Sequence, residues 1–318
     1  MKLSVWAMSV AWGVSLAGGV PVAQAAEPTA EQYKTGVTTC MRARDLECAE
    51  KNWGQYLRLR PNDSNAIANL GIVMNQRDNH KGAVVQFERA IDMGEGTYDL
   101  FSYYADSLEK LGRIDDAIAW SYKALKVVPT LVDVRGKLAK LLVQQKKYYE
   151  ALSLLTAFDE QLASQGHAPY FEGQRIAIES AIERNASVPS VERGSLRLAA
   201  QRGHFFAPVT LGESRPAAFM VDTGATIVSM GDEFFASAKV AFKVREKSAS
   251  FKMADGRRVS GRVLTVAVLK VGPYELKDIA VHTCKGCSPL LGQAALSRFD
   301  LKSSKVQGVE FLALSPRN

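Results

Sequence analysis

A period of 34 residues runs through the first half of this 318-residue sequence and constrains its fold more than any other feature. One phase of the period is always alanine, at Ala49, Ala83, Ala117 and Ala151. Bulky side chains stand four residues later in three of the four repeats, and small or modest ones stand twelve residues earlier in all of them. Small residues let two helices approach closely, and bulky ones fill the groove between neighbours. The period therefore predicts an all-α solenoid of stacked antiparallel helix pairs.

Residues that end helices recur at a second phase of the same period. Pro61 and Pro129 lie just past the second helix of a pair, and in the second repeat Glu95 takes this place beside Gly94, which can end the helix instead. The whole pattern resembles the tetratricopeptide repeat. This resemblance implies about four repeats and a capping helix within residues 28–185, with a surface that holds a peptide or a protein partner.

The helical pattern is expected to end with that capping helix, from about residue 169 to residue 183, with Gly173 in the small-residue phase. Residues 186–194 then lose the helical period and gain turn-forming residues, which predicts a linker. Beyond it, short β-type runs separated by turns predict a mostly β domain over residues 195–318. The runs are Ser195–Ala200, His204–Leu211, Ala217–Val221, Thr226–Met230, Ser248–Met253, Arg262–Val271, Asp278–His282 and Val309–Leu314.

Residues 1–25 have the pattern of a secretory signal peptide: Lys2, an apolar stretch, and an A-x-A site that ends at Ala25. A retained membrane anchor is the alternative, because no charge lies between Lys2 and Glu27. Pro21 and two glycines interrupt the apolar run, which favours cleavage. We therefore expect export to the periplasm, with cleavage near Ala25 and no stable membrane span afterwards.

The composition suits a globular protein with two cores and argues against some functions. Apolar residues make up 47% of the sequence and charged residues 23%, which is too apolar for general disorder. The net charge of +7 includes no run of five or more basic residues. We therefore expect neither nucleic acid nor a membrane surface as a partner. No cofactor is expected either, because neither an HExxH motif nor a complete P-loop occurs.

Asp222 lies where a buried strand is expected to end. The apolar residues before it lead directly into Asp222-Thr223-Gly224, and a second apolar strand follows. Such a turn can present a carboxylate at a strand end, while Gly224 allows a close backbone approach that a side chain would block. The Thr223 hydroxyl can form a local hydrogen bond and hold the loop. An aspartate that only caps a turn is the simpler alternative.

Three elements in this order resemble the retropepsin-like aspartic proteases, and the resemblance covers residues 195–314. The family's catalytic motif corresponds to Asp222-Thr223-Gly224, followed by Ala225 as a substrate contact. Its substrate-covering flap corresponds to the predicted hairpin tip Ala254-Asp255-Gly256. The element that supports the catalytic loop corresponds to Leu290-Leu291-Gly292, with a short helix after it. The insertion before Leu290 has no counterpart that the resemblance explains.

Hydrolysis of a peptide by carboxylates needs one group to activate water and one to protonate the amide nitrogen. The sequence holds a single Asp-Thr/Ser-Gly, so it encodes half of such a pair. The resemblance implies a homodimer in which Asp222 of each protomer contributes, with Thr223 bonding across the axis. We expect an aspartic endopeptidase that acts on peptides or proteins. The alternative is a repeat-domain scaffold with a weakly active or inactive lobe.

Four cysteines form two close pairs, which suits disulfides in an exported chain. Cys40 and Cys48 flank an expected helix-to-helix turn. Cys284 and Cys287 form a C-x-x-C, and His282 adds a third candidate metal ligand. A structural zinc site normally has four ligands. A local disulfide is therefore preferred here, with free thiols and a metal or redox site as alternatives.

Overall fold

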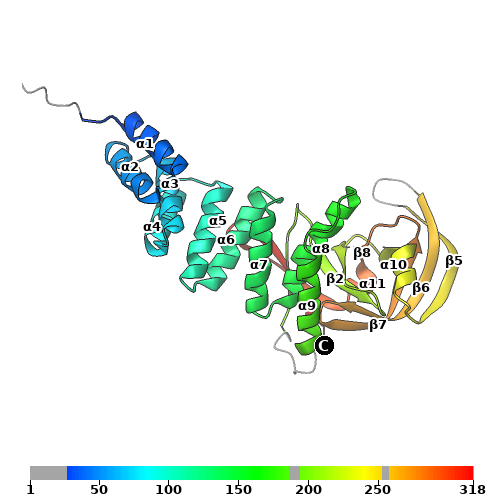
Figure 1. Ribbon diagram of the computed structural model, residues 1–318. Helices are drawn as coiled ribbons and strands as arrows, with labels where there is room; N and C mark the ends of the chain where they lie inside the picture. Colours follow the sequence, from blue (N-terminus) through cyan, green and yellow to red (C-terminus); the bar gives the residue numbers. More distant parts are fainter. Residues whose placement is uncertain (1–26, 186–193, 253–257, 318) are drawn as a thin grey trace, which may run out of the picture.

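The computed structural model describes residues 27–185, 194–252 and 258–317, and it shows a helical array joined to a β domain (Figure 1). The expected signal peptide, linker residues 186–193 and the flap tip Ala254-Asp255-Gly256 lie outside the described residues, and those expectations remain predictions. Within the described residues, no helix combines the length and the apolar character that a membrane crossing requires.

Within residues 27–185, four helix pairs follow one another and a single helix comes after them (Figure 1). The helices are α1(Ala30–Arg42), α2(Leu46–Leu59), α3(Ser64–Gln76), α4(His80–Asp92), α5(Tyr98–Lys110), α6(Ile114–Val127), α7(Val132–Gln144), α8(Tyr148–Ser164) and α9(Glu172–Asn185). Each pair packs on the next, so the predicted all-α repeat array is confirmed.

The positions that recur in each 34-residue repeat lie where the helices contact one another. The four alanines of the first phase are fully buried. Gly71 shows why small residues are needed there, because a Cβ added to it would lie 2.8 Å from the ring of buried Phe87. Helix ends follow the sequence as well: Gly94 has φ +91°, and the backbone N–H of Glu95 donates to the Ala90 carbonyl. Glycine adopts this left-handed conformation without a steric penalty, so it ends α4.

The last helix departs from the prediction. It begins at Glu172 instead of residue 169, because Asp159 of α8 holds the preceding turn by accepting hydrogen bonds from the N–H groups of Tyr170 and Phe171. Gly173 is exposed, and a Cβ added to it would contact nothing within 4 Å. The expectation that Gly173 mediates close helix packing was therefore wrong.

The described residues of the β domain, 194–252 and 258–317, form two sheets and two short helices. Its strands are β1(Leu196–Ala199), β2(Phe206–Leu211), β3(Ala217–Val221), β4(Val228–Gly231), β5(Phe242–Lys252), β6(Arg258–Val271), β7(Tyr274–Cys284), β8(Leu290–Leu291), β9(Phe299–Val306) and β10(Val309–Pro316). The helices are α10(Asp232–Ser237) and α11(Gln293–Leu296). One sheet has the order β1-β10-β9, and the other has the order β2-β3-β8-β4-β7-β6-β5.

The larger sheet closes on itself, because β2 pairs with both β3 and β6. Its alternating apolar side chains fill the enclosed space, with Phe219, Val266 and Val281 fully buried. Two strands were not expected. β9 exposes seven of its eight residues and is mostly polar, and the two-residue β8 is too short to show a period. Both are held by backbone pairing with β10, β3 and β4, which a side-chain pattern does not reveal.

The helical array and the β domain share a core. Val309 and Phe311 of β10 belong to the same buried cluster as the helices, and the ring of Phe311 packs edge-on against Tyr122 of α6 at 5.2 Å between centroids. Polar contacts add to this: Arg135 donates to the Gln201 side chain, and the Ser153 hydroxyl donates to the Phe206 carbonyl. The two domains therefore share one packed interface, although helices and strands occupy separate parts of the sequence.

Candidate active site

Asp222 lies directly after β3, and β8 holds it there. The two strands run parallel, with Val221 opposite Leu291. The backbone N–H of Asp222 donates to the Leu291 carbonyl at 3.1 Å, and the N–H of Met220 donates to the Pro289 carbonyl at 3.0 Å. The sequence therefore presents a carboxylate at the end of an apolar strand, as the local pattern predicts. Ala218 and Phe219 of that strand are buried, and its other three residues are partly exposed.

The turn after Asp222 leaves the carboxylate accessible. The N–H of Gly224 donates to Asp222 Oδ1 at 2.9 Å, and the N–H of Ala225 donates to the Asp222 carbonyl at 3.3 Å. Asp222 is half-buried, while Thr223 and Gly224 are exposed. Among the described residues no cation forms an ion pair with Asp222. The carboxylate is thus oriented by one backbone donor and is otherwise open to solvent or a partner.

Thr223 and Gly224 do not act within one chain as the sequence suggested. No hydrogen bond from the Thr223 hydroxyl occurs in the part of the chain that the structure describes; instead, its carbonyl accepts from Gln293 Nε2 at 2.9 Å. A Cβ on Gly224 would meet only the carboxylate of Asp222, at 3.3 Å. The space around both residues is open, so the close approach expected at Gly224 is absent inside a single protomer.

Gly292 is the glycine that packing requires at this site. A Cβ there would lie 2.3 Å from the Ile227 carbonyl and 2.7 Å from the Ala225 carbonyl. The N–H of Gln293 donates to that Ala225 carbonyl at 2.8 Å, and the N–H of Ala294 donates to the Thr226 carbonyl at 3.0 Å. The start of α11 therefore caps the loop that follows Asp222. Sequence reasoning did not single out Gln293, although it directly follows the Leu-Leu-Gly element.

Strands β5 and β6 pair as a long antiparallel ribbon that borders the expected flap residues. The strands pair up to Phe251 opposite Val259 and Lys252 opposite Arg258. The ring of Phe251 lies 4.0 Å from that of His282 on β7. These strands flank the expected flap residues, whose role stays a prediction.

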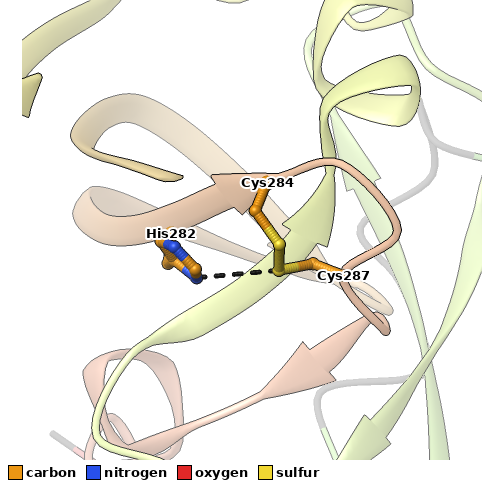
Figure 2. Close-up of side chains that lie close together, drawn as sticks. All are labelled: His282, Cys284 and Cys287. Carbon is orange, nitrogen blue, oxygen red and sulfur yellow. Dashed lines mark hydrogen bonds between the residues drawn. A yellow bond between two sulfur atoms is a disulfide. The ribbon is translucent and has the colours of Figure 1, made fainter. Parts of the chain in front are cut away.

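Both cysteine pairs form disulfides, Cys40 with Cys48 and Cys284 with Cys287. The second bond lies beside His282 (Figure 2), and Nδ1 of that ring is 3.8 Å from Cys287 Sγ. Burial lowers the pKa of His282, and the charge of Asp232 partly opposes this. The imidazole therefore favours its neutral form.

A cavity of about 620 Å³ lies between the helical array and the β domain. Its wall includes Met220, two residues before Asp222, and Leu290 of β8. Glu160 of α8 also lines it and accepts a hydrogen bond from the N–H of Ala218 at 2.7 Å. Burial raises the pKa of Glu160 to about 7, although the Ala218 hydrogen bond and the charge of Arg175 act in the opposite direction.

Comparison with known proteins agrees with this geometry. Residues 207–298 match the family model described as gag-polyprotein putative aspartyl protease. The β domain is retropepsin-like. The matched segment includes Asp222-Thr223-Gly224, strands β5 and β6 and the Leu-Leu-Gly element, so the three sequence elements that carry the resemblance fall within it. The search of curated proteins gave no significant match.

Several solved structures are similar to the helical array, and some of them are described as tetratricopeptide-repeat (TPR) proteins. YrrB, described as a TPR protein with an unusual peptide-binding site, is 20% identical with a TM-score of 0.40, covering 50% of this chain and 88% of that one. MamA is 12% identical with a TM-score of 0.37, covering 51% and 95%. The first TPR of Spaghetti, bound to an HSP90 peptide, is 12% identical with a TM-score of 0.35, covering 37% and 93%.

Proposed function

We propose that this protein is an aspartic endopeptidase whose active form is a homodimer, with Asp222 of each protomer forming the catalytic pair. The observation that carries the proposal is the presentation of Asp222. Its backbone is held by β8, its Oδ1 is oriented by the Gly224 N–H, and the surface around Thr223 and Gly224 is open. One such lobe supplies one carboxylate, and a second copy supplies the other.

The chemistry follows from bringing the two carboxylates together. Two like charges about 3 Å apart cannot both ionise easily, so they share one proton. The ionised group takes a proton from a water molecule as that water attacks the peptide carbonyl. The protonated group donates a hydrogen bond to the carbonyl oxygen. A proton is then transferred from the carboxyl pair to the leaving amine nitrogen. General acid and base catalysis of this kind contributes about 100- to 10,000-fold to the rate.

The helical array would recruit the substrate or a partner protein. It is joined to the lobe through α6, α7 and α8, so a segment bound on the array is held at a fixed position relative to β3. Export to the periplasm belongs to the same proposal, and the two disulfides support it because such bonds persist in oxidising compartments.

The test compares wild type with Asp222→Asn on a mixed peptide library, together with light scattering to determine oligomeric state. Cleavage by the wild-type dimer and none by the variant is the expected result. A mixing experiment tests the shared pair: in an equimolar mixture that exchanges subunits, about a quarter of the dimers carry two intact carboxylates. Activity that falls only in proportion to the fraction of wild-type chain in the mixture would contradict an active site shared by two protomers. Equal cleavage by both proteins would exclude Asp222 chemistry and favour the scaffold function.

A further inference from the structure

Three buried side chains with metal-binding atoms meet at the end of β7. His282, Cys284 and Cys287 are 2%, 2% and 7% exposed, and their ligand atoms all lie within 4.8 Å of one another. Figure 2 shows the imidazole facing the disulfide, with Nδ1 toward Cys287 Sγ. The described residues contain no second group of this kind, and the Cys40–Cys48 pair has no histidine beside it.

One distance in the cluster, from His282 Nδ1 to Cys287 Sγ, is compatible with two ligands of one metal ion. Zinc binds sulfur at about 2.3 Å and nitrogen at about 2.0–2.1 Å, which places the two ligand atoms roughly 3.6–3.8 Å apart at tetrahedral to trigonal angles. The observed separation of Nδ1 and Sγ is 3.8 Å. The imidazole could therefore bind an ion next to the sulfur with little movement.

Two buried polar atoms without a hydrogen-bond partner among the described residues lie on the face of the sheet that carries the cluster. They are His282 Nε2 and the Ser229 hydroxyl. Ser229 is the β4 partner of His282 in the strand pairing. Native proteins rarely leave such atoms unpaired, and a water bound to an ion on His282 Nδ1 is one way to satisfy the Ser229 hydroxyl. Nε2 lies on the other side of the ring, toward Gly261 of β6, and would stay outside the coordination.

We propose that this cluster is a redox-gated zinc site. The disulfide form lacks thiolates and does not bind zinc. A dithiol reductant transfers two electrons to the disulfide and leaves as its own disulfide, while one proton is added at each of Cys284 and Cys287. Zn²⁺ then displaces both thiol protons to solvent and binds the two sulfurs and His282 Nδ1, with water as the fourth ligand. Two thiolates balance the charge of Zn²⁺, so the buried site remains uncharged.

The cluster lies between strand β6 and the segment that leads into β8. The chain leaves Cys287 through Ser288 and Pro289 into β8, which holds the backbone of Asp222. On the other side β6 packs closely, because a Cβ on Gly261 would lie 2.6 Å from His282 Nε2. Zinc in the reduced protein would therefore connect the same segment as the disulfide does and add His282 to the link. The support of the catalytic loop would then persist in both oxidation states.

The test uses the full-length protein, reduced with a phosphine that does not bind zinc and then titrated with Zn²⁺ against a chromophoric chelator. The reduced wild type should bind one zinc ion per chain, and the oxidised protein should bind none. Cys284→Ser combined with Cys287→Ser should abolish binding. The matched pair Cys40→Ser with Cys48→Ser should retain it, which separates the site from general thiol affinity.

His282→Gln tests the third ligand and should weaken zinc affinity by at least about 100-fold. X-ray absorption of the zinc-loaded protein should show two sulfur neighbours and one imidazole nitrogen. Circular dichroism of each oxidised or reduced variant confirms that it is folded. Zinc binding that survives loss of Cys284 and Cys287, depends on Cys40 and Cys48, or is unchanged in His282→Gln would overturn the proposal. Binding of monovalent copper without zinc would overturn it as well.

Discussion

Glu160→Gln is expected to stabilise the protein at neutral and higher pH, because Glu160 is a buried carboxyl between the two domains. Its side chain leaves α8 and accepts a hydrogen bond from the N–H of Ala218 on β3 at 2.7 Å. Burial raises its pKa from 4.5 to about 7, and the Ala218 hydrogen bond and Arg175 only partly offset this. A glutamine side chain keeps a carbonyl oxygen for the Ala218 N–H and carries no charge at any pH.

The sign and size follow from linkage between protonation and folding. A carboxyl whose pKa is raised by folding is protonated more readily in the folded state, so its contribution to stability is complete below pH about 4.5. That contribution falls as the pH rises through 7, because ionisation then costs more in the folded protein than in the unfolded chain. A shift from 4.5 to about 7 corresponds to about 3 kcal/mol.

Urea unfolding of wild type and Glu160→Gln at pH 5 and pH 8 measures this difference. The advantage of the variant in unfolding free energy should be larger at pH 8 than at pH 5, by up to about 3 kcal/mol. Glu183→Gln on α9 is the matched control, because Glu183 is exposed and should show no such pH dependence. The reasoning is refuted if the two free-energy curves stay parallel between pH 5 and pH 8, or if Glu160→Gln is the less stable protein at pH 8.

Three further predictions concern single positions. Gly292→Ala should cost about 1–3 kcal/mol and reduce cleavage, because the new Cβ would lie 2.3 Å from the Ile227 carbonyl; an unchanged urea midpoint would contradict this. Asp63→Ala should cost about 1–2 kcal/mol, since Asp63 caps α3 and accepts from the Tyr56 hydroxyl at 2.6 Å; thermal unfolding measures the loss. Asp222→Asn should lower kcat/KM by at least about 100-fold while leaving the melting temperature nearly unchanged, and a large loss of stability would show that Asp222 mainly caps its turn.

The helical half of the fold was predictable because its signal is repeated. A single buried alanine predicts little, but four alanines at the same position of the repeat predict a helix contact. The close packing of Gly71 on the Phe87 ring shows the kind of contact that this recurrence predicts. The capping helix was harder, since it has no equivalent to compare. Its start depends on Asp159, a residue of the preceding helix whose hydrogen bonds reach Tyr170 and Phe171. Such a contact leaves no periodic trace in the sequence.

The loop that carries Asp222 was predictable from local order, while its surroundings were not. An apolar strand before Asp222 and a Leu-Leu-Gly element are contiguous patterns, and the structure brings Leu291 and Asp222 together. Strand β9 was missed because all but one of its residues face solvent, and backbone pairing alone places it beside β10. The local contacts expected of Thr223 and Gly224 were not found, because Thr223 is exposed and a Cβ on Gly224 would meet only the Asp222 carboxylate.

The shared core implies that the β domain depends on the helical array for its stability. Phe311 is 1% exposed and packs against Tyr122, and the N–H of Ala218 is capped by Glu160. A fragment of residues 194–318 would expose that apolar surface and leave the N–H of Ala218 in β3 without its partner. We expect it to unfold at a lower temperature than the β domain in the full chain and to bind a hydrophobic dye, as measured by calorimetry and fluorescence. Equal unfolding temperatures would show that the interface contributes little. The expected result would mean that the array is part of the support for the strand that presents Asp222.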